Sequence, residues 1–117
     1  MTAPVGRDEL AAGLAAGRVT VVDALPAAYW AQQHLPGALN IVEDDVDRLA
    51  PELLPDTTAP IVVYCSNAAC GNSRAVAARL ERLGHTDVRT YPGGIQDWVE
   101  AGLPVEAGAV PADDRAG

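Results

Sequence analysis

The sequence predicts an α/β fold, in one domain built on a parallel sheet of four or five strands with helices on both faces. Two observations lead to this class. Short apolar runs suited to strands alternate along the chain with helical apolar stripes, which is the pattern of parallel sheets. The clearest run, residues 61–64 (Ile-Val-Val-Tyr), has no polar position, as in strands buried on both faces. The 117 residues suffice for one such core.

The first half of the chain supplies three predicted helices and two further strands. Helices are predicted over residues 7–16, 26–33 and 43–54, and strands over residues 19–22 and 38–41. Leu10 and Leu14 share one face of the first helix, and Gly17 lies just past its end. Pro51 is expected to kink or end the third helix. Residues 1–6 are expected to be a loose end with room for a short edge strand.

Two polar residues in this half are assigned structural roles. An Asp at the carboxyl end of a strand can be catalytic, but it more often hydrogen-bonds neighbouring backbone amides, and we predict that role for Asp23. His34 has no second histidine or carboxylate patterned beside it. We therefore predict that its side chain is hydrogen-bonded into the turn rather than acting as a base or a metal ligand.

The second half continues the alternation. Ser73 is placed to be the N-cap of a helix whose apolar stripe ends before Gly84. A strand over residues 87–91 and a short helix over residues 95–101 follow. Between them, residues 92–94 (Pro-Gly-Gly) form a turn in which glycine is expected to supply a positive φ or a close backbone approach.

The predicted domain covers residues 1–105. Residues 106–117 are rich in Ala, Gly, Pro and Asp, and we expect them to form a disordered C-terminal tail.

Cys65 is the candidate nucleophile, because it stands between the carboxyl end of the buried strand and the start of the following helix. Ligands bind at this position in open α/β sheets. The helix start favours a thiolate and a bound anion, and a tight loop of small residues can turn its amides inward around the anion. The predicted substrate-binding residues form this loop: Ser66, Asn67, Ala68, Ala69, Cys70, Gly71, Asn72, Ser73 and Arg74. A free cysteine is otherwise most often a small buried apolar residue.

Charge and composition exclude several classes of partner. Sixteen acidic and eight basic residues give a net charge of −8, which argues against nucleic acid. No stretch is long and apolar enough for a membrane span, and the N-terminus lacks the features of a secretory signal. Two cysteines separated by four residues do not suggest a disulfide scaffold, so we expect a reducing, cytoplasmic setting. We expect no cofactor and no metal.

Three segments follow a known order. They are Val21-Val22-Asp23 with His34-Leu35-Pro36-Gly37-Ala38, then Val63-Tyr64-Cys65, then Gly84 with Tyr91-Pro92-Gly93-Gly94, Trp98 and Gly102-Leu103-Pro104. Together they resemble the rhodanese family of sulfurtransferases, over about residues 10–105. The resemblance implies a single rhodanese-like domain and places Cys65 at the family's active-site cysteine.

The resemblance also implies a reaction in two half-steps. The cysteine thiolate takes the outer sulfur of a small anionic donor such as thiosulfate and becomes a persulfide. It then passes that sulfur to a thiol or to cyanide. The loop amides between Ser66 and Ser73 would hold the donor and stabilise the persulfide.

The loop departs from the common family pattern, Cys-x-x-Gly-x-Arg-Ser. It is about two residues longer, has no charged residue between Cys65 and Ser73, and places Arg74 after the serine. The family's usual Asp-x-Arg after the first strand is Asp23-Ala24-Leu25 here. Two orientations are open for Arg74: over the mouth of the loop, or turned to solvent as an ordinary residue of the first helical turn.

Cys70 is the second unusual feature of the loop, and the sequence leaves its role open. It can be a plain small residue, or a resolving thiol that forms a disulfide with Cys65 or relays its sulfur. Metal binding by the two cysteines is disfavoured because no second Cys or His pair supplies the other ligands.

Two alternatives to the sulfurtransferase follow from the same features. One is a catalytically weak redox-sensing or binding module of the same fold, using Cys65 and Cys70. The other is a phosphatase or arsenate reductase, which needs a loop arginine spaced to clamp an oxyanion, and this loop has none between Cys65 and Ser73.

Overall fold

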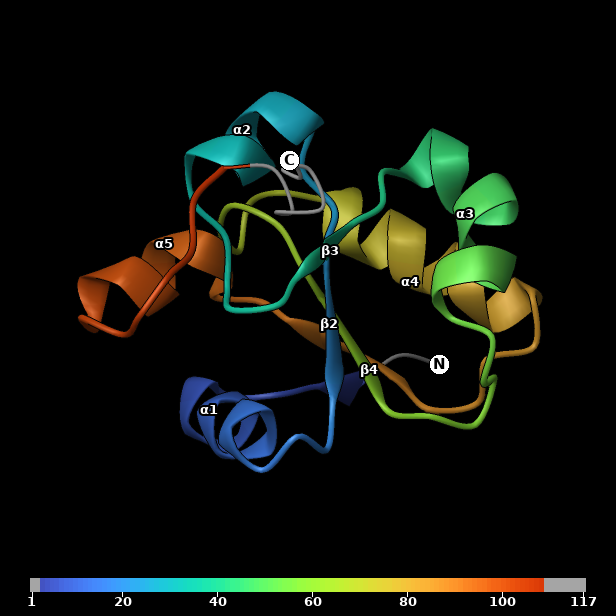
Figure 1. The fold of residues 1–117 in the computed structure, drawn as a ribbon, viewed down its shortest axis with the longest axis horizontal. Helices are drawn as coiled ribbons and strands as arrows, with labels where there is room; N and C mark the ends of the chain where they lie inside the picture. The colour runs from blue at the N-terminus through green and yellow to red at the C-terminus, as the bar shows by residue number, and fades with distance from the viewer. Residues whose placement is uncertain (1–2, 109–117) are drawn as a thin grey trace.

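A five-stranded sheet, parallel throughout, forms the centre of the computed structural model, which describes residues 3–108 (Figure 1). The strands are β1 (Ala3–Pro4), β2 (Thr20–Asp23), β3 (Leu39–Asn40), β4 (Ile61–Tyr64) and β5 (Val88–Tyr91), in the order β1-β5-β4-β2-β3. β1 is the short edge strand for which the N-terminal end left room. β4 lies in the middle of the sheet. Five parallel strands alternating with helices along the chain confirm the predicted fold class.

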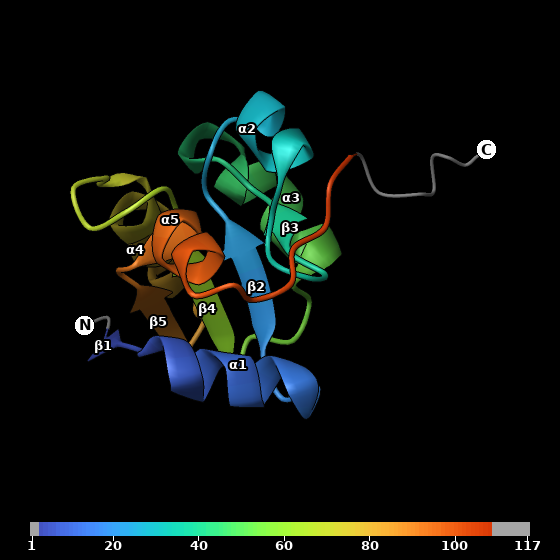
Figure 2. The same ribbon diagram turned by 90° about the vertical axis from the view of Figure 1, so that its left-hand side faces the viewer.

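Helices cover both faces of this sheet. α1 (Arg7–Ala15) and α5 (Gly94–Glu100) lie on one face, and α3 (Val46–Leu53) and α4 (Asn72–Arg82) lie on the other (Figure 1). α2 (Ala27–Gln32) lies beyond the carboxyl end of β2, whereas α1 runs past the opposite end (Figure 2).

Alternate residues of the central strands divide between two cores. Val22 and Val63 pack with residues of α3 and α4, whereas Val21, Val62 and Tyr64 pack with Leu10, Leu35, Tyr91 and Trp98. All four residues of β4 are buried. Burial on both faces, predicted from the unbroken apolar run, is therefore confirmed.

Two predicted helix starts differ from the structure. The helix expected over residues 43–54 is split into one 3₁₀ turn, η1 (Glu43–Asp45), followed by α3, and Pro51 lies inside α3 without ending it. Ser73 is not the N-cap of α4, because that position is occupied by Gly71. The Ser73 side chain is instead buried in the first turn, against the sulfur of Cys65.

The chain after residue 105 is described only as far as residue 108. Glu106 pairs with His34 in a short antiparallel bridge through two backbone hydrogen bonds of 2.8 Å. The rest of the predicted tail, residues 109–117, lies outside the described residues, so the boundary after residue 105 stays a prediction. Within residues 3–108, no helix has the length and apolar composition needed to cross a membrane.

Candidate active site

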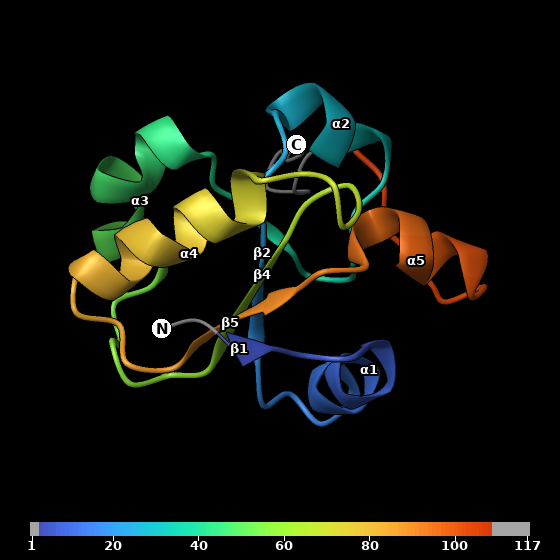
Figure 3. The same cartoon turned by 180° about the vertical axis from the view of Figure 1, so that it is seen from behind.

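The candidate nucleophile Cys65 lies at the carboxyl edge of the sheet, directly after β4. Residues 66–71 then form a loop that leads into α4, and this loop lies between the start of α4 and α5 (Figure 3). The Cys65 residue is only 2% exposed, while Cys70 is half-buried at the far end of the loop. The geometry places Cys65 at the edge where ligands bind in parallel sheets, as the sequence predicted.

The sulfur of Cys65 is enclosed by polar groups of the loop and of α4. It lies 3.5 Å from the carbonyl oxygen of Cys70 and 3.5 Å from the hydroxyl of Ser73. The Cys65 and Cys70 side chains are also near enough to influence each other's ionisation. Both cysteines are free.

These surroundings favour the protonated form of Cys65. Burial raises the pKa of the Cys65 thiol, and its hydrogen bond with Cys70 raises it further. The hydroxyl and amide of Ser73 act in the opposite direction without outweighing burial. The expectation that the helix start would favour a Cys65 thiolate is therefore wrong for the resting site, because the thiol is more deeply buried than the sequence indicates.

The backbone amides at the two ends of the loop contact the sulfur of Cys70 and not that of Cys65 alone. Partial burial opposes its ionisation, but the neighbouring Cys65 thiol and bonds from two backbone amides, one in the loop and one at the start of α4, lower the pKa of Cys70. Those amides belong to Ser66 and Asn72, and the Ser66 hydroxyl also contacts the Cys70 sulfur. The loop thus surrounds a sulfur atom of its own with donors suited to an anion.

The start of α5 fixes the backbone of the loop from the other side. The amide of Ile95 donates to the carbonyl of Cys65 at 2.9 Å, and the amide of Gln96 donates to the carbonyl of Ser66 at 3.0 Å. The side chains of Asn67 and Gln96 join the same two segments at 3.0 Å. Sequence analysis missed Gln96, because no local pattern reveals that a helix thirty residues downstream reaches this loop.

Within the loop, Asn67 organises the turn. Its side-chain oxygen accepts a bond from the Ala69 amide at 2.9 Å, and its carbonyl accepts one from the Cys70 amide at 3.1 Å. Two of the amides predicted to bind the donor, those of Ala69 and Cys70, are therefore already hydrogen-bonded within the loop.

Arg74 is exposed, and its guanidinium lies 3.7 Å from the point where a Cβ on Gly71 would stand. Arg74 therefore bends back toward the end of the loop.

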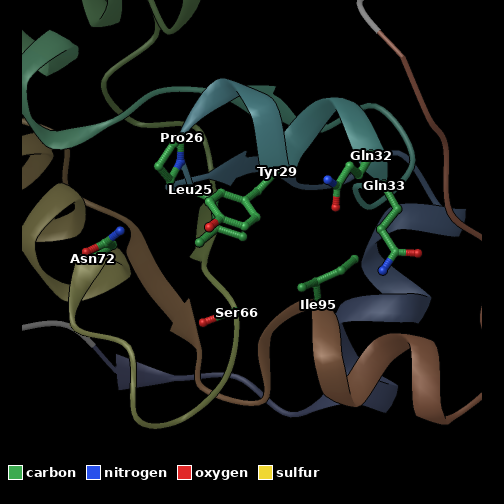
Figure 4. A pocket seen from close by; sticks show the side chains of 8 residues that line it. All are labelled: Leu25, Pro26, Tyr29, Gln32, Gln33, Ser66, Asn72 and Ile95. Atoms are coloured by element: carbon green, nitrogen blue, oxygen red, sulfur yellow. The ribbon is translucent and has the colours of Figure 1, made fainter.

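A pocket of about 410 Å³ opens beside the loop, between α2 and the start of α5 (Figure 4). Its walls are uncharged, and its lining residues are Leu25, Pro26, Tyr29, Gln32, Gln33, Ser66, Asn72 and Ile95. The helix that carries Tyr29 follows β2, the strand next to β4, so its place near the site follows from strand order. The pocket residues themselves carried no signal in the sequence.

A buried hydrogen-bond network supports the strand behind Cys65. The Tyr64 hydroxyl donates to Asp23 at 2.7 Å and accepts from the Leu35 amide at 3.0 Å. Asp23 also accepts from the Leu25 amide at 2.8 Å, which confirms its predicted structural role. His34 contacts the carbonyl of Trp30 through Nδ1 at 2.7 Å, and its predicted role in the turn is likewise confirmed.

Comparison with known proteins identifies the family. The family model of the rhodanese-like domain matches residues 6–101. The chain belongs to the rhodanese-like domain family. This confirms the resemblance of the three sequence segments, whereas the role of Cys65 as the family's active-site cysteine stays a prediction.

Three similar proteins illustrate the range of this family. The domain is 40% identical over 106 residues to the HTH-type transcriptional regulator Rv0324 of Mycobacterium tuberculosis, across 90% of this chain and 45% of that protein. It is 28% identical over 87 residues to thiosulfate sulfurtransferase GlpE of Actinobacillus pleuropneumoniae, across 74% of this chain and 77% of that protein. A solved rhodanese with anions from E. coli superposes with a TM-score of 0.64 at 26% identity, across 77% of this chain and 99% of that one. The rhodanese-like domain therefore spans less than half the length of the regulator, and has distant sulfurtransferase relatives.

The rhodanese-like fold brings the predicted site residues together in part. Ser66, Cys70, Asn72 and Ser73 all contact one of the two sulfurs, whereas Ala68 and Ala69 are exposed on the outer side of the loop. Within residues 3–108, no group of three His, Cys, Asp or Glu side chains comes together as a metal site.

Proposed function

We propose that this rhodanese-like domain is a sulfurtransferase that moves a sulfane sulfur from a donor such as thiosulfate to a thiol or cyanide, through a persulfide on Cys65. The observation that carries the proposal is the position of Cys65. Its thiol stands at the carboxyl end of the central strand, at the start of a loop that encloses it, in a domain of the rhodanese-like family.

The chemistry needs no cofactor. The Cys65 thiolate attacks the outer sulfur of thiosulfate, a new S–S bond forms, and sulfite leaves with the electron pair of the broken bond. An acceptor then attacks the outer sulfur of the persulfide and takes it away. The Cys65 thiolate is regenerated, and with cyanide the product is thiocyanate.

The loop and the neighbouring pocket would bind the two substrates, the sulfur donor and the sulfur acceptor. Arg74, bent back toward Gly71, is the cation that would draw in a small anionic donor at the end of the loop. The uncharged pocket under α2 suits the body of a thiol acceptor, since it borders the loop at Ser66 and Asn72. Neither nucleic acid nor a membrane is part of this proposal, and the free thiols fit a cytoplasmic protein.

The test is the intact mass of reduced protein after incubation with thiosulfate, followed by peptide mapping. We expect one added sulfur on Cys65, released by cyanide as thiocyanate, and no added sulfur in Cys65→Ser. Circular dichroism of the variant provides the control for folding. Sulfur transfer by Cys65→Ser, or an unmodified Cys65 in the natural protein, would refute the proposal.

A second candidate is a redox-sensing or binding module on the same fold, with little turnover. The closeness of Cys70, whose carbonyl oxygen lies 3.5 Å from the Cys65 sulfur, favours it, because neighbouring thiols are placed for reversible disulfide formation. Turnover separates the two: the module predicts a reversible disulfide with negligible thiocyanate formation, and the sulfurtransferase predicts repeated transfer.

A further inference from the structure

We propose that Cys70 is a resolving thiol: it attacks the persulfide on Cys65 at the inner sulfur, closes a Cys65–Cys70 disulfide and releases hydrosulfide. This inference rests on the proposed function, and it adds to that function a regulatory step that switches the site off.

The position of Cys70 beside the Cys65 sulfur carries the inference. The carbonyl oxygen of Cys70 lies 3.5 Å from the Sγ of Cys65, and the two side chains are near enough to influence each other's ionisation. After the first half-reaction, the same Sγ is the inner sulfur of the persulfide. A disulfide requires a sulfur–sulfur bond of about 2 Å and a Cα separation below about 7 Å. The close approach of the Cys70 backbone to the Cys65 sulfur places the two cysteines for such a bond.

Groups around Cys70 suit an attacking thiolate. The amides of Ser66 and Asn72 and the Ser66 hydroxyl contact its sulfur, and they stabilise negative charge there. These donors come from both ends of the loop, which holds Cys70 turned inward. Ala68 and Ala69 of the same loop are exposed, whereas Cys70 is half-buried.

The step balances without an external oxidant. The Cys70 sulfur forms a bond to the inner sulfur, and the bond between the inner and outer sulfurs breaks. The outer sulfur leaves with the electron pair and takes up the proton of the Cys70 thiol, as hydrosulfide. The sulfane sulfur is reduced, and the two cysteine sulfurs are oxidised to a disulfide.

The consequence is that sulfur transfer stops when no acceptor reaches the persulfide before Cys70 attacks it. An acceptor attacks the outer sulfur and restores Cys65, whereas Cys70 attacks the inner sulfur and removes both thiols from use. A reducing thiol must then open the disulfide before the next turnover.

The experiment loads the reduced full chain by two routes, with oxygen excluded. One sample is treated with thiosulfate and the other with inorganic polysulfide, which delivers sulfane sulfur without catalysis. After desalting, hydrosulfide is trapped with a bimane reagent over time, and the cysteines are mapped by mass spectrometry. We expect one hydrosulfide for each persulfide lost, a Cys65–Cys70 linked peptide, and renewed loading after treatment with a dithiol.

Variants separate this step from other losses of sulfur. Cys70→Ala and Cys70→Ser should keep the persulfide and release hydrosulfide at least about tenfold more slowly. Cys65→Ser should form no linked peptide. The inference is overturned if Cys70→Ala releases hydrosulfide as fast as the natural protein. It is also overturned if the sulfur moves to Cys70, or if polysulfide leaves Cys65 unloaded or leaves a stable persulfide.

The two loading routes distinguish the failure of the inference from the failure of the proposed function. Loading by polysulfide alone, followed by hydrosulfide release, would refute thiosulfate transfer and support the resolving thiol. Loading by both routes with a lasting persulfide would support transfer and refute the resolving thiol.

Discussion

Replacement of Gly94 by alanine is expected to destabilise the domain and displace the backbone of Cys65. Gly94 has φ +65°, in the left-handed region, and a Cβ there would stand 2.5 Å from the carbonyl oxygen of Cys65. It would also stand 2.6 Å from the carbonyl carbon and oxygen of Ser66. These neighbours are backbone atoms, so the contact cannot be relieved by a change of rotamer.

The magnitude follows from two separable costs. A left-handed conformation costs an alanine roughly 1–2 kcal/mol. Forcing additional atoms into a packed region costs typically about 1–3 kcal/mol more. Gly102 provides the matched control, because it has φ +77° but no atom within 4 Å of the point where a Cβ would stand. Gly102→Ala should therefore show the conformational cost alone, and Gly94→Ala the sum, about 2–5 kcal/mol.

The assay is urea unfolding of both variants, which gives the free energy of unfolding, together with the rate of persulfide formation from thiosulfate. Gly94→Ala should lose clearly more stability than Gly102→Ala, and it should load sulfur more slowly at temperatures where both remain folded. Equal losses of stability in the two variants would refute the reasoning, because they would show that the close approach to Cys65 and Ser66 has no energetic consequence.

Three further predictions concern Cys65 and the residues that support it. Tyr64→Phe removes the hydroxyl that links Asp23 to the Leu35 amide, so we expect the free energy of unfolding in urea to fall by about 1–3 kcal/mol. An unchanged unfolding midpoint would contradict the role of this network. Because burial raises the pKa of Cys65, thiosulfate loading should speed up as pH rises through and above the ordinary range for thiols. Ser73→Ala removes a hydroxyl that lowers this pKa, so its rate–pH curve should shift to higher pH, with loading a few-fold slower at neutral pH; a shift to lower pH would count against the assignment.

The sheet was predictable because its signals are local and strong. The run over residues 61–64 matches β4 at both ends, since four apolar residues rich in β-branched side chains directly after a proline favour a short strand. Asp23 was assigned to its turn for a similar reason: a carboxylate two residues before an amide at a strand end has that amide within reach.

The loop was predictable in position but not in its interior. Serine is a residue type typical of the N-cap, yet the Ser73 hydroxyl contacts the buried Cys65 sulfur, and Gly71 occupies the N-cap position. That exchange depends on tertiary contacts, because α5 holds the Cys65 and Ser66 carbonyls and so decides where the loop begins to turn. Local propensity carries no information about a partner so distant in sequence.

Contacts within the loop also explain why the pKa of Cys65 is raised and not lowered as the sequence suggested. The sequence places Cys65 before a helix start, but the loop amides of Ser66 and Asn72 face Cys70. An anionic donor would therefore compete with the Cys70 sulfur for the amides of Ser66 and Asn72. These donors come from the two ends of the loop, so no single stretch of sequence shows which of the two sulfurs they contact.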